Sequence, residues 1–381
     1  MKERLAMEVP FTFGKLVHDD DFTDRIPETR RLVSNFESSI NTILISPRRW
    51  GKSSLVLKAT KQVRRKSKDI IICMMDLQNV RSEEQFYRLI ATKVLQASAS
   101  RIDTMLENAK SFLGRFIPNL SFSPDPGTEL KLSMDWEQVK KDPDDILDLA
   151  EKIALKAKKK LVLCIDEFQN IAEFEDPLGF QRKLRSHWQL HQHVSYCLYG
   201  SKRHMLMEVF SSPSMPFYKF GDLIFLEKIK EEEWITFITK RFKGTGKAIE
   251  NESAQRIAML CENHPYYVQQ LSQQVWLRTE EICESVTIQL AFDDLVMQLS
   301  MLFQILTDDL TTRQINFLNA IINKEEKLTS REVLNAYNLG TSANALKVKK
   351  SLHDREILDI VGKRINFNDP LYKYWLEYYY F

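Results

Sequence analysis

The segment Ser46–Ser54, which reads Ser-Pro-Arg-Arg-Trp-Gly-Lys-Ser-Ser, constrains the fold of this chain more than any other part of the sequence. The apolar run Ile43–Ile45 before it predicts a buried strand, and the apolar spacing over Leu55–Val63 after it predicts a helix. A loop between a strand and the start of a helix gathers backbone N–H groups and a helix N-terminus around one point, where an anion is held. The sequence therefore predicts a phosphate-binding loop on an α/β sheet.

Individual residues of this loop have distinct expected roles. Gly51 lets the backbone approach the phosphates, Lys52 places a charge on the β and γ oxygens, and the Ser53 hydroxyl is suited to bind Mg²⁺. Ser46 stands where the first glycine of G-x-x-x-x-G-K-[ST] is usual. The residues expected to contact the nucleotide here are Pro47, Arg48, Arg49, Trp50, Gly51, Lys52, Ser53 and Ser54.

Two acidic residues close another apolar run and are the expected partners of this loop. The run Leu161–Ile165 is the strongest buried-strand signal in the chain, and Asp166 and Glu167 follow it. Because the carboxyl ends of parallel strands meet at one edge of a sheet, we expect both carboxylates near the loop. Asp166 would hold Mg²⁺, and Glu167 would act as the general base on the attacking water. The alternative is a buried strand that reaches solvent at two acids, but the two features in this order favour an ATP and Mg²⁺ site.

A third apolar run, Val194–Tyr199, ends in Gly200 and Ser201. The Ser201 side chain could reach the attacking water or the γ-phosphate, although Gly-Ser is also an ordinary strand-to-loop turn. Lys202 and Arg203 follow directly and are further candidates for contact with the γ-phosphate.

The composition is that of an ordinary globular protein, and its small net charge creates no strong electrostatic field. The 381 residues are 44% hydrophobic and 28% charged with a net charge of +2, which allows two or three domains and indicates that any nucleic-acid contact is local. The five scattered cysteines indicate thiols in a reducing compartment. The first residues have no apolar signal core and no run of about 20 apolar residues occurs, so we expect a cytoplasmic protein without membrane contact.

The order of apolar patterns along the chain predicts three domains. Strands alternate with helices up to about residue 226, which predicts a parallel sheet, and a helical pattern then runs from Glu231 to about Met301. Helices followed by a hairpin, as in a winged helix-turn-helix, close the sequence. The expected domains are a P-loop domain at 1–228, with helices at 82–95 and 144–159 and an inserted hairpin region at about 96–145, a helical lid at 229–300, and a winged-helix domain at 301–381.

The expected recognition helix of the last domain starts after an N-cap at Thr341-Ser342 and is basic. A basic helix and a basic wing tip suit contact with a DNA backbone, whereas a solvated lysine face on a protein-docking winged helix is the alternative. The candidates for DNA contact are Lys347, Lys349, Lys350, Lys363 and Arg364, and the residues expected to face inward are Leu346, Val348 and Leu352.

Taken together, these motifs resemble the prokaryotic archaeal-type ATPase family, a branch of the STAND NTPases related to AAA+ proteins. The similar segments run nearly from end to end. They are Pro10–Gly14, Phe22–Glu28, Ser46–Ser54, Leu163–Glu167, Tyr199–Ser201, Asn263–Tyr267 and Phe367–Leu371. The resemblance implies an α/β P-loop NTPase parallel sheet of the AAA+/STAND type, followed by a helical lid and a winged helix-turn-helix.

The resemblance also implies further site residues. His264 and Pro265 would lie near the base or the phosphates, and Phe22 and Arg25 would border the adenine. The family often has Gly-Arg shortly before the strand at Leu223, where this chain has Lys219, a poor bidentate substitute for arginine. Arg203, or an arginine from a neighbouring subunit, would have to complete the site.

The sequence thus predicts a slowly hydrolysing ATPase that acts as a nucleotide-dependent switch between ATP and ADP states. The partners expected besides the nucleotide are DNA through the winged helix, or a protein or a second copy of the chain. Two alternatives are an ATP-regulated DNA-binding regulator and a protein-docking module of an anti-phage defence or mobile-element system.

Overall fold

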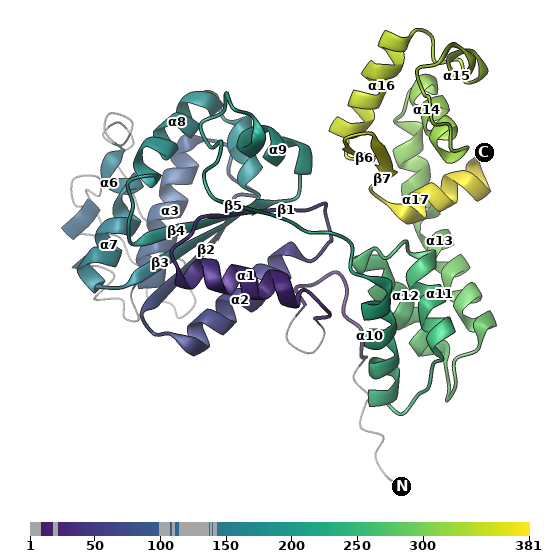
Figure 1. Ribbon diagram of the computed structural model, residues 1–381, viewed down its shortest axis with the longest axis horizontal. Helices are drawn as coiled ribbons and strands as arrows, with labels where there is room; N and C mark the ends of the chain where they lie inside the picture. Colours follow the sequence, from purple (N-terminus) through teal and green to yellow (C-terminus); the bar gives the residue numbers. More distant parts are fainter. Residues whose placement is uncertain are drawn as a thin grey trace. The chain divides into compact units, whose positions relative to one another are not determined.

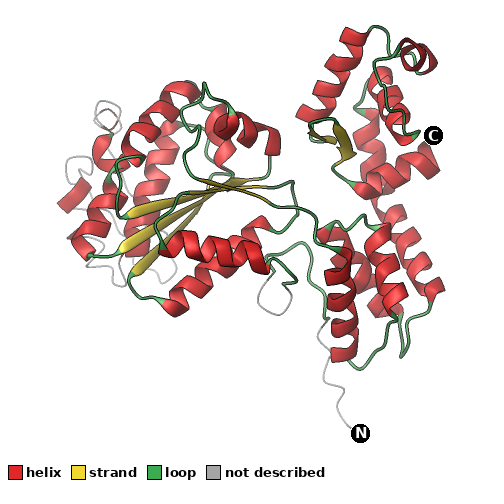
Figure 2. Cartoon of the chain, in the orientation of Figure 1, coloured by secondary structure: helices red, strands yellow, loops and turns green. Residues whose placement is uncertain are grey.

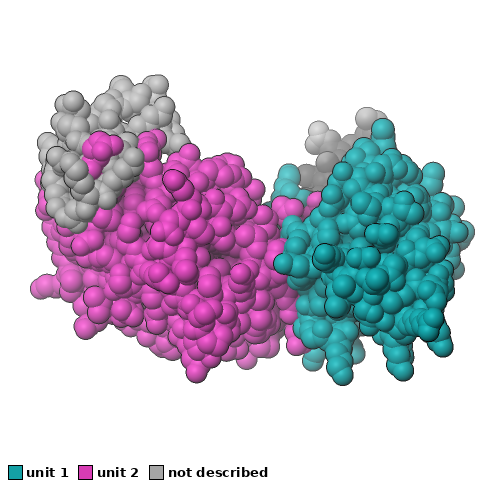
Figure 3. Space-filling model, turned by 90° about the horizontal axis from the view of Figure 1, so that it is seen from above, with its two compact units in different colours: residues 1–24, 228–381 teal, residues 25–227 magenta. Residues whose placement is uncertain are grey.

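The computed structural model describes residues 9–17, 22–98, 107–108, 111–113, 137, 139 and 143–381. The chain forms two compact units, which are coloured separately in Figure 3. We call Arg25–Glu227 the α/β unit, and Met1–Asp24 with Lys228–Phe381 the helical unit. The boundary after Glu227 lies one residue before the one expected from the sequence.

The α/β unit is built on a five-stranded parallel sheet with the strand order β2-β3-β4-β1-β5 (Figure 1). Long apolar runs form these strands because both faces of such a sheet are covered by helices, and all seven residues of β4 are buried. The sheet and its strands agree with the sequence analysis. The strands are β1 (Thr42–Ile45), β2 (Ile70–Asp76), β3 (Lys160–Asp166), β4 (Val194–Gly200) and β5 (Asp222–Phe225).

The helices of the α/β unit largely follow the predicted pattern. The helix expected at 82–95 is confirmed by α3, which buries Phe86, Ile90 and Val94. The single helix expected over 144–159 is wrong, because two helices meet at Asp148, whose carboxylate is held by His187. The expected hairpin at Leu120–Met134 lies outside the described residues. The helices are α1 (Ile26–Glu37), α2 (Lys52–Lys66), α3 (Glu83–Ser98), α6 (Asp144–Leu147), α7 (Leu149–Ala157), η2 (Phe168–Glu173), α8 (Pro177–Trp188) and α9 (Arg203–Ser211).

The described residues of the helical unit form helices and a hairpin, as the colouring of Figure 2 shows. In its second half, three helices precede the hairpin, which is the order of a winged helix. Val361 pairs with Arg364, which leaves Gly362 and Lys363 as a two-residue turn with Gly362 at a φ of 61°. The elements are α10 (Glu231–Gly244), α11 (Asn251–Leu260), α12 (Pro265–Arg278), α13 (Ser285–Asp308), α14 (Thr312–Ile322), α15 (Arg331–Ala336), α16 (Ser342–Asp354), β6 (Leu358–Val361), β7 (Arg364–Phe367), α17 (Pro370–Trp375) and η3 (Leu376–Tyr380).

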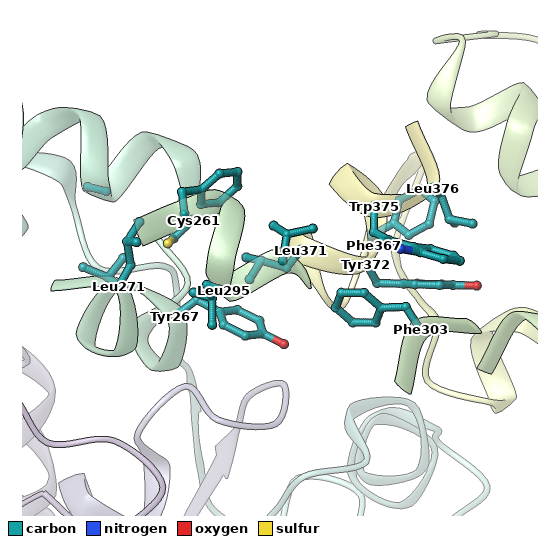
Figure 4. Close-up of a cluster of buried hydrophobic side chains, with 14 of the residues drawn as sticks. Cys261, Tyr267, Leu271, Leu295, Phe303, Phe367, Leu371, Tyr372, Trp375 and Leu376 are labelled. Atoms are coloured by element: carbon teal, nitrogen blue, oxygen red, sulfur yellow. The ribbon is translucent and has the colours of Figure 1, made fainter. Parts of the chain in front are cut away.

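A single hydrophobic core runs through the lid and the winged helix. Tyr267 of α12, Leu295 and Phe303 of α13, and Tyr372 of α17 belong to one buried cluster (Figure 4). The boundary expected after residue 300 falls inside α13, which is one continuous helix. The lid and the winged helix are therefore packed as one body.

The first described residues also belong to this core. Phe11 is buried, and its ring lies 6.1 Å from that of Phe237 and 5.8 Å from that of Phe242. Placing residues 9–17 in the P-loop domain is therefore wrong, because the Phe11 side chain is covered by α10. Among the described helices, α13 is long and apolar enough to cross a membrane, and a third of its most apolar stretch is buried inside the protein.

Candidate nucleotide-binding site

The loop Ser46–Ser54 joins the end of β1 to the start of α2, as the sequence predicts. Gly51 has a φ of 85°, a left-handed conformation that glycine adopts at low cost, and Lys52 begins the helix. The first N–H groups of α2 therefore lie around the loop, where they can bind an anion. Ser46, in place of the usual glycine, is buried and donates its hydroxyl to the Pro47 carbonyl at 3.1 Å.

The side chains of this loop divide into two groups. Arg48 and Arg49 are exposed and Trp50 is half-buried, whereas Lys52 and Ser54 are buried. Of these residues, Lys52 lies beside Glu167 at the acidic end of β3. Contacts of the exposed arginines with a nucleotide remain predictions.

Ser53 and Asp166 form the first of two close pairs at this edge of the sheet. The Ser53 hydroxyl donates to Asp166 Oδ2 at 2.7 Å, and the Glu167 backbone N–H donates to Asp166 Oδ1 at 2.8 Å. Burial raises the pKa of Asp166 to about 6, although the charge of Lys52 and both hydrogen bonds oppose this change. A hydroxyl and a carboxylate side by side are oxygen ligands of the kind that Mg²⁺ prefers.

Lys52 and Glu167 form the second pair. Lys52 Nζ lies 3.9 Å from Glu167 Oε1, and the Ser201 hydroxyl donates to Glu167 Oε2 at 2.8 Å. Burial alone would raise the pKa of Glu167, but hydrogen bonds from Gln169 and Ser201 and the charge of Lys52 outweigh it, so the pKa is lowered. The pKa of Asp166 is thus raised, whereas the pKa of the adjacent Glu167 is lowered. Ser201, expected at the γ-phosphate, contacts the proposed general base in this structure.

Gln169 is the site residue that the sequence analysis missed. It lies in η2, directly after the acidic pair, is 1% exposed, and donates its amide N–H to Glu167 Oε2. The available signal was a glutamine between Phe168 and Ile171, two residues that are fully buried. A polar residue inside such a short apolar segment has to find a hydrogen-bond partner.

The two basic residues after Ser201 point to different roles. Lys202 donates to Glu173 at 2.9 Å, so its charge is paired at the surface. Arg203 is the first residue of α9 and is half-buried. Its contact with a γ-phosphate remains a prediction.

Residues expected around the base are distributed over both units. Arg25 immediately precedes α1, is 3% exposed, and forms an ion pair with Glu28 at 3.2 Å. Phe22, His264 and Pro265 belong to the helical unit, and the last two open α12 with His264 buried. Their contact with a nucleotide remains a prediction.

Lys219 lies near the amino ends of the strands, whereas the loop lies at their carboxyl ends. It precedes β5, and β5 runs parallel to β1 with Asp222 beside Thr42 and Phe225 beside Ile45. Residues before β5 therefore lie near the beginning of β1, whereas the loop follows its end. Lys219 is too far away to act on a phosphate bound by the loop of its own chain.

The basic residues of the winged helix lie mostly at the surface. Lys347, Lys350, Lys363 and Arg364 are exposed, and Lys349 is half-buried. Leu346 was expected to face inward, but it is 56% exposed. The inward positions of α16 are Ala345, Val348 and Leu352, and a residue next to one of them is turned by about 100° around the helix.

The sequence matches no family model and no curated protein. Several solved structures are similar in fold, including the following two. The Walker-type ATPase PABY2304 of Pyrococcus abyssi has a TM-score of 0.66 and 15% identity, with 96% of this chain and 99% of that one covered. The ORC2 protein of Aeropyrum pernix, solved in ADPNP–ADP complexes, has a TM-score of 0.52 and 13% identity, with 93% of each chain covered. The chain therefore has a P-loop NTPase fold followed by a helical and winged-helix region.

Proposed function

We propose that this chain binds ATP with Mg²⁺ at the loop Ser46–Ser54 and hydrolyses it slowly, as a nucleotide-dependent conformational switch. One observation supports this most. Ser53 lies 2.7 Å from Asp166, and these two side chains can hold a cation. Lys52, whose positive charge can neutralise phosphate, lies 3.9 Å from the second carboxylate, Glu167. Of the similar proteins, one is described as a Walker-type ATPase and another was solved with ADPNP and ADP.

Each residue of the site would have one task in the reaction. Lys52 neutralises phosphate charge, and Ser53 with Asp166 holds the cation, which when bound neutralises charge on the β and γ oxygens. Glu167 accepts a proton from a water molecule while the water oxygen bonds to the γ-phosphorus. The bond from that phosphorus to the bridging oxygen breaks, and ADP and phosphate leave.

Slow turnover is supported by the state of the general base and by the position of Lys219. The carboxylate of Glu167 is engaged by Ser201 and Gln169, and its pKa is lowered, which makes it a weaker base. Lys219 lies near the amino ends of the strands, away from the loop. A stabilising arginine would have to be Arg203 or come from a second copy of the chain.

A physical link between lid and winged helix supports the switch. Tyr267, in the turn expected at the nucleotide, donates its hydroxyl to Asp369, which also accepts from the N–H groups of Leu371 and Tyr372 and so caps α17. Lys373 of α17 donates to Glu262, just before the same turn, at 2.7 Å. A movement of this turn on nucleotide binding would therefore carry the winged helix with it.

The partner of the winged helix is proposed to be DNA, with a protein partner as second candidate. The exposed lysines of α16 and the Lys363-Arg364 wing tip support DNA-backbone contact and a regulator role. The 56% exposed Leu346 on the same helix favours a docked protein. All five cysteines are free and buried, which supports a cytoplasmic location.

The first test of this function is the variant Glu167→Gln, with ATP binding and phosphate release measured separately. We expect ATP to remain bound while turnover falls at least about a hundredfold, because a general base contributes roughly 10²- to 10⁴-fold. Lys52→Ala should lose ATP binding, and Lys58→Ala on the same helix is the matched control. Unchanged turnover in Glu167→Gln would remove Glu167 from the mechanism, and a wild-type chain that binds no ATP would contradict the proposal.

A further inference from the structure

One oxygen of the Glu167 carboxylate accepts three hydrogen bonds. Its Oε2 accepts from the Ser201 backbone N–H at 3.3 Å, from the Ser201 hydroxyl at 2.8 Å and from the Gln169 amide. Its Oε1 lies 3.9 Å from Lys52 Nζ. These contacts stabilise the charged carboxylate and direct it toward protein donors. A carboxylate in this arrangement is poorly placed to take a proton from water.

The orientation of the Gln169 amide follows from its neighbours. Its Nε2 faces Glu167 Oε2 and also Asn170 Oδ1 at 3.4 Å, and both of these oxygens accept hydrogen bonds. The reversed amide would place oxygen against oxygen, so the NH₂ group has to face Glu167. Gln169 is 1% exposed, which leaves its side chain little freedom to turn away.

The space for this amide depends on Gly200. A Cβ added to Gly200 would lie 1.8 Å from Gln169 Oε1 and 3.3 Å from the Glu167 Cα. A side chain at position 200 would therefore displace the glutamine amide. The absence of a side chain at the end of β4 and the glutamine after β3 together make the contact with Glu167 possible.

We propose that Gln169 is a positioning residue that, with Ser201, holds Glu167 away from the attacking water and thereby limits the rate of ATP hydrolysis. The proposal rests on the proposed ATPase function. Ser201 has two alternative acceptors, the Glu167 carboxylate and the γ-phosphate. When Ser201 turns to the phosphate, the Gln169 amide remains on Glu167. Gln169 therefore sets how readily the general base becomes free.

Two variants disturb this contact in different ways. Gln169→Met keeps a side chain of similar length but removes the donor, and Gly200→Ala pushes the amide away. In both, we expect kcat at saturating ATP to rise about threefold to tenfold, because loss of a hydrogen bond to the carboxylate frees a stronger base. The rise should appear in kcat and not in KM, because the contact acts on the general base and not on nucleotide binding. ATP affinity should stay unchanged.

Gln181→Met is the matched control. Gln181 lies in α8 of the same unit and is also 1% exposed, so its replacement tests the general cost of losing a buried glutamine. It should leave kcat unchanged. A similar rise in kcat in this control, or an unchanged or lower kcat in Gln169→Met, would overturn the proposal.

A second measurement does not require turnover. Crystal structures of wild type and of Gln169→Met, both without nucleotide, show where the Glu167 carboxylate lies. We expect Glu167 Oε2 to leave its position beside residue 169 in the variant, and an unmoved carboxylate would overturn the proposal. If the wild-type chain hydrolyses no ATP, the proposed function fails, yet this comparison still decides whether Gln169 holds the carboxylate.

Discussion

Asp166 is a partly buried carboxylate whose charge reduces the stability of the folded chain when no cation is bound. Burial raises its pKa to about 6 from an ordinary value of 3.8. Because the folded state then binds the proton more tightly than the unfolded state, stability decreases as the pH rises from about 4 through about 6 and stays reduced above that. A difference of about two pKa units corresponds to about 3 kcal/mol of unfolding free energy.

Asp166→Asn removes this charge and keeps the shape of the side chain. The amide oxygen can still accept from the Glu167 N–H, and the amide nitrogen can donate to the Ser53 hydroxyl, so both existing contacts have a replacement. We expect the variant to be more stable than wild type by about 3 kcal/mol at pH 7.5 and by about half of that at pH 5. Binding of ATP with Mg²⁺ should weaken, because a neutral amide is a poorer ligand for the cation.

The assay is urea unfolding of the full chain without nucleotide at pH 5 and pH 7.5, with the transition of the α/β unit followed in wild type and variant. Asp76→Asn is the control, because Asp76 pairs in register with Asp166 on the neighbouring strand but is exposed. This control measures the effect of the same substitution at an exposed strand end. A stabilisation by Asp166→Asn that is absent, or independent of pH, would refute the argument that burial of the charge is the cause.

Two further predictions concern the helical unit. Tyr267→Phe removes a donor to the Asp369 carboxylate and should lower the unfolding free energy of this unit by about 1–3 kcal/mol, as measured in urea. Tyr266→Phe at the neighbouring position is the control and should have less effect. Equal losses of stability would contradict the role of the Asp369 contact. Lys347→Ala with Lys350→Ala should weaken DNA binding and reduce its salt dependence by about two phosphate contacts in a fluorescence titration, and DNA binding that is unchanged would favour the protein partner.

The sequence alone was enough to place the loop and the acidic pair. Both lie at the ends of apolar runs, and the strands β1 and β3 begin and end within a residue of the predicted runs. Such runs are local signals, because a strand buried on both faces needs apolar residues throughout. The expectation that Ser53 and Asp166 meet follows from parallel topology, since carboxyl ends of parallel strands share one edge.

Local patterns were less informative where contacts come from distant parts of the chain. Phe11 is covered by α10, more than 200 residues away in sequence, so its unit could not be assigned from its neighbours. Leu346 was expected to face inward from its position in the pattern, but it is exposed. An apolar residue at the edge of the buried face of a helix can remain in contact with solvent. Asp148, where α6 and α7 meet, likewise contacts a residue that is distant along the chain, His187.

By itself, then, the sequence determined the loop between β1 and α2, the two carboxylates after β3 and the alternation of strands and helices, because these depend on residues close together along the chain. Only the tertiary structure placed β4 between β1 and β3, and with it Ser201 and Gln169 against Glu167. It also changed the pKa values of the two adjacent acids in opposite directions, upward for Asp166 and downward for Glu167. The physical reason is that burial and hydrogen bonding of a carboxylate depend on atoms that folding brings together, and residue spacing does not specify them.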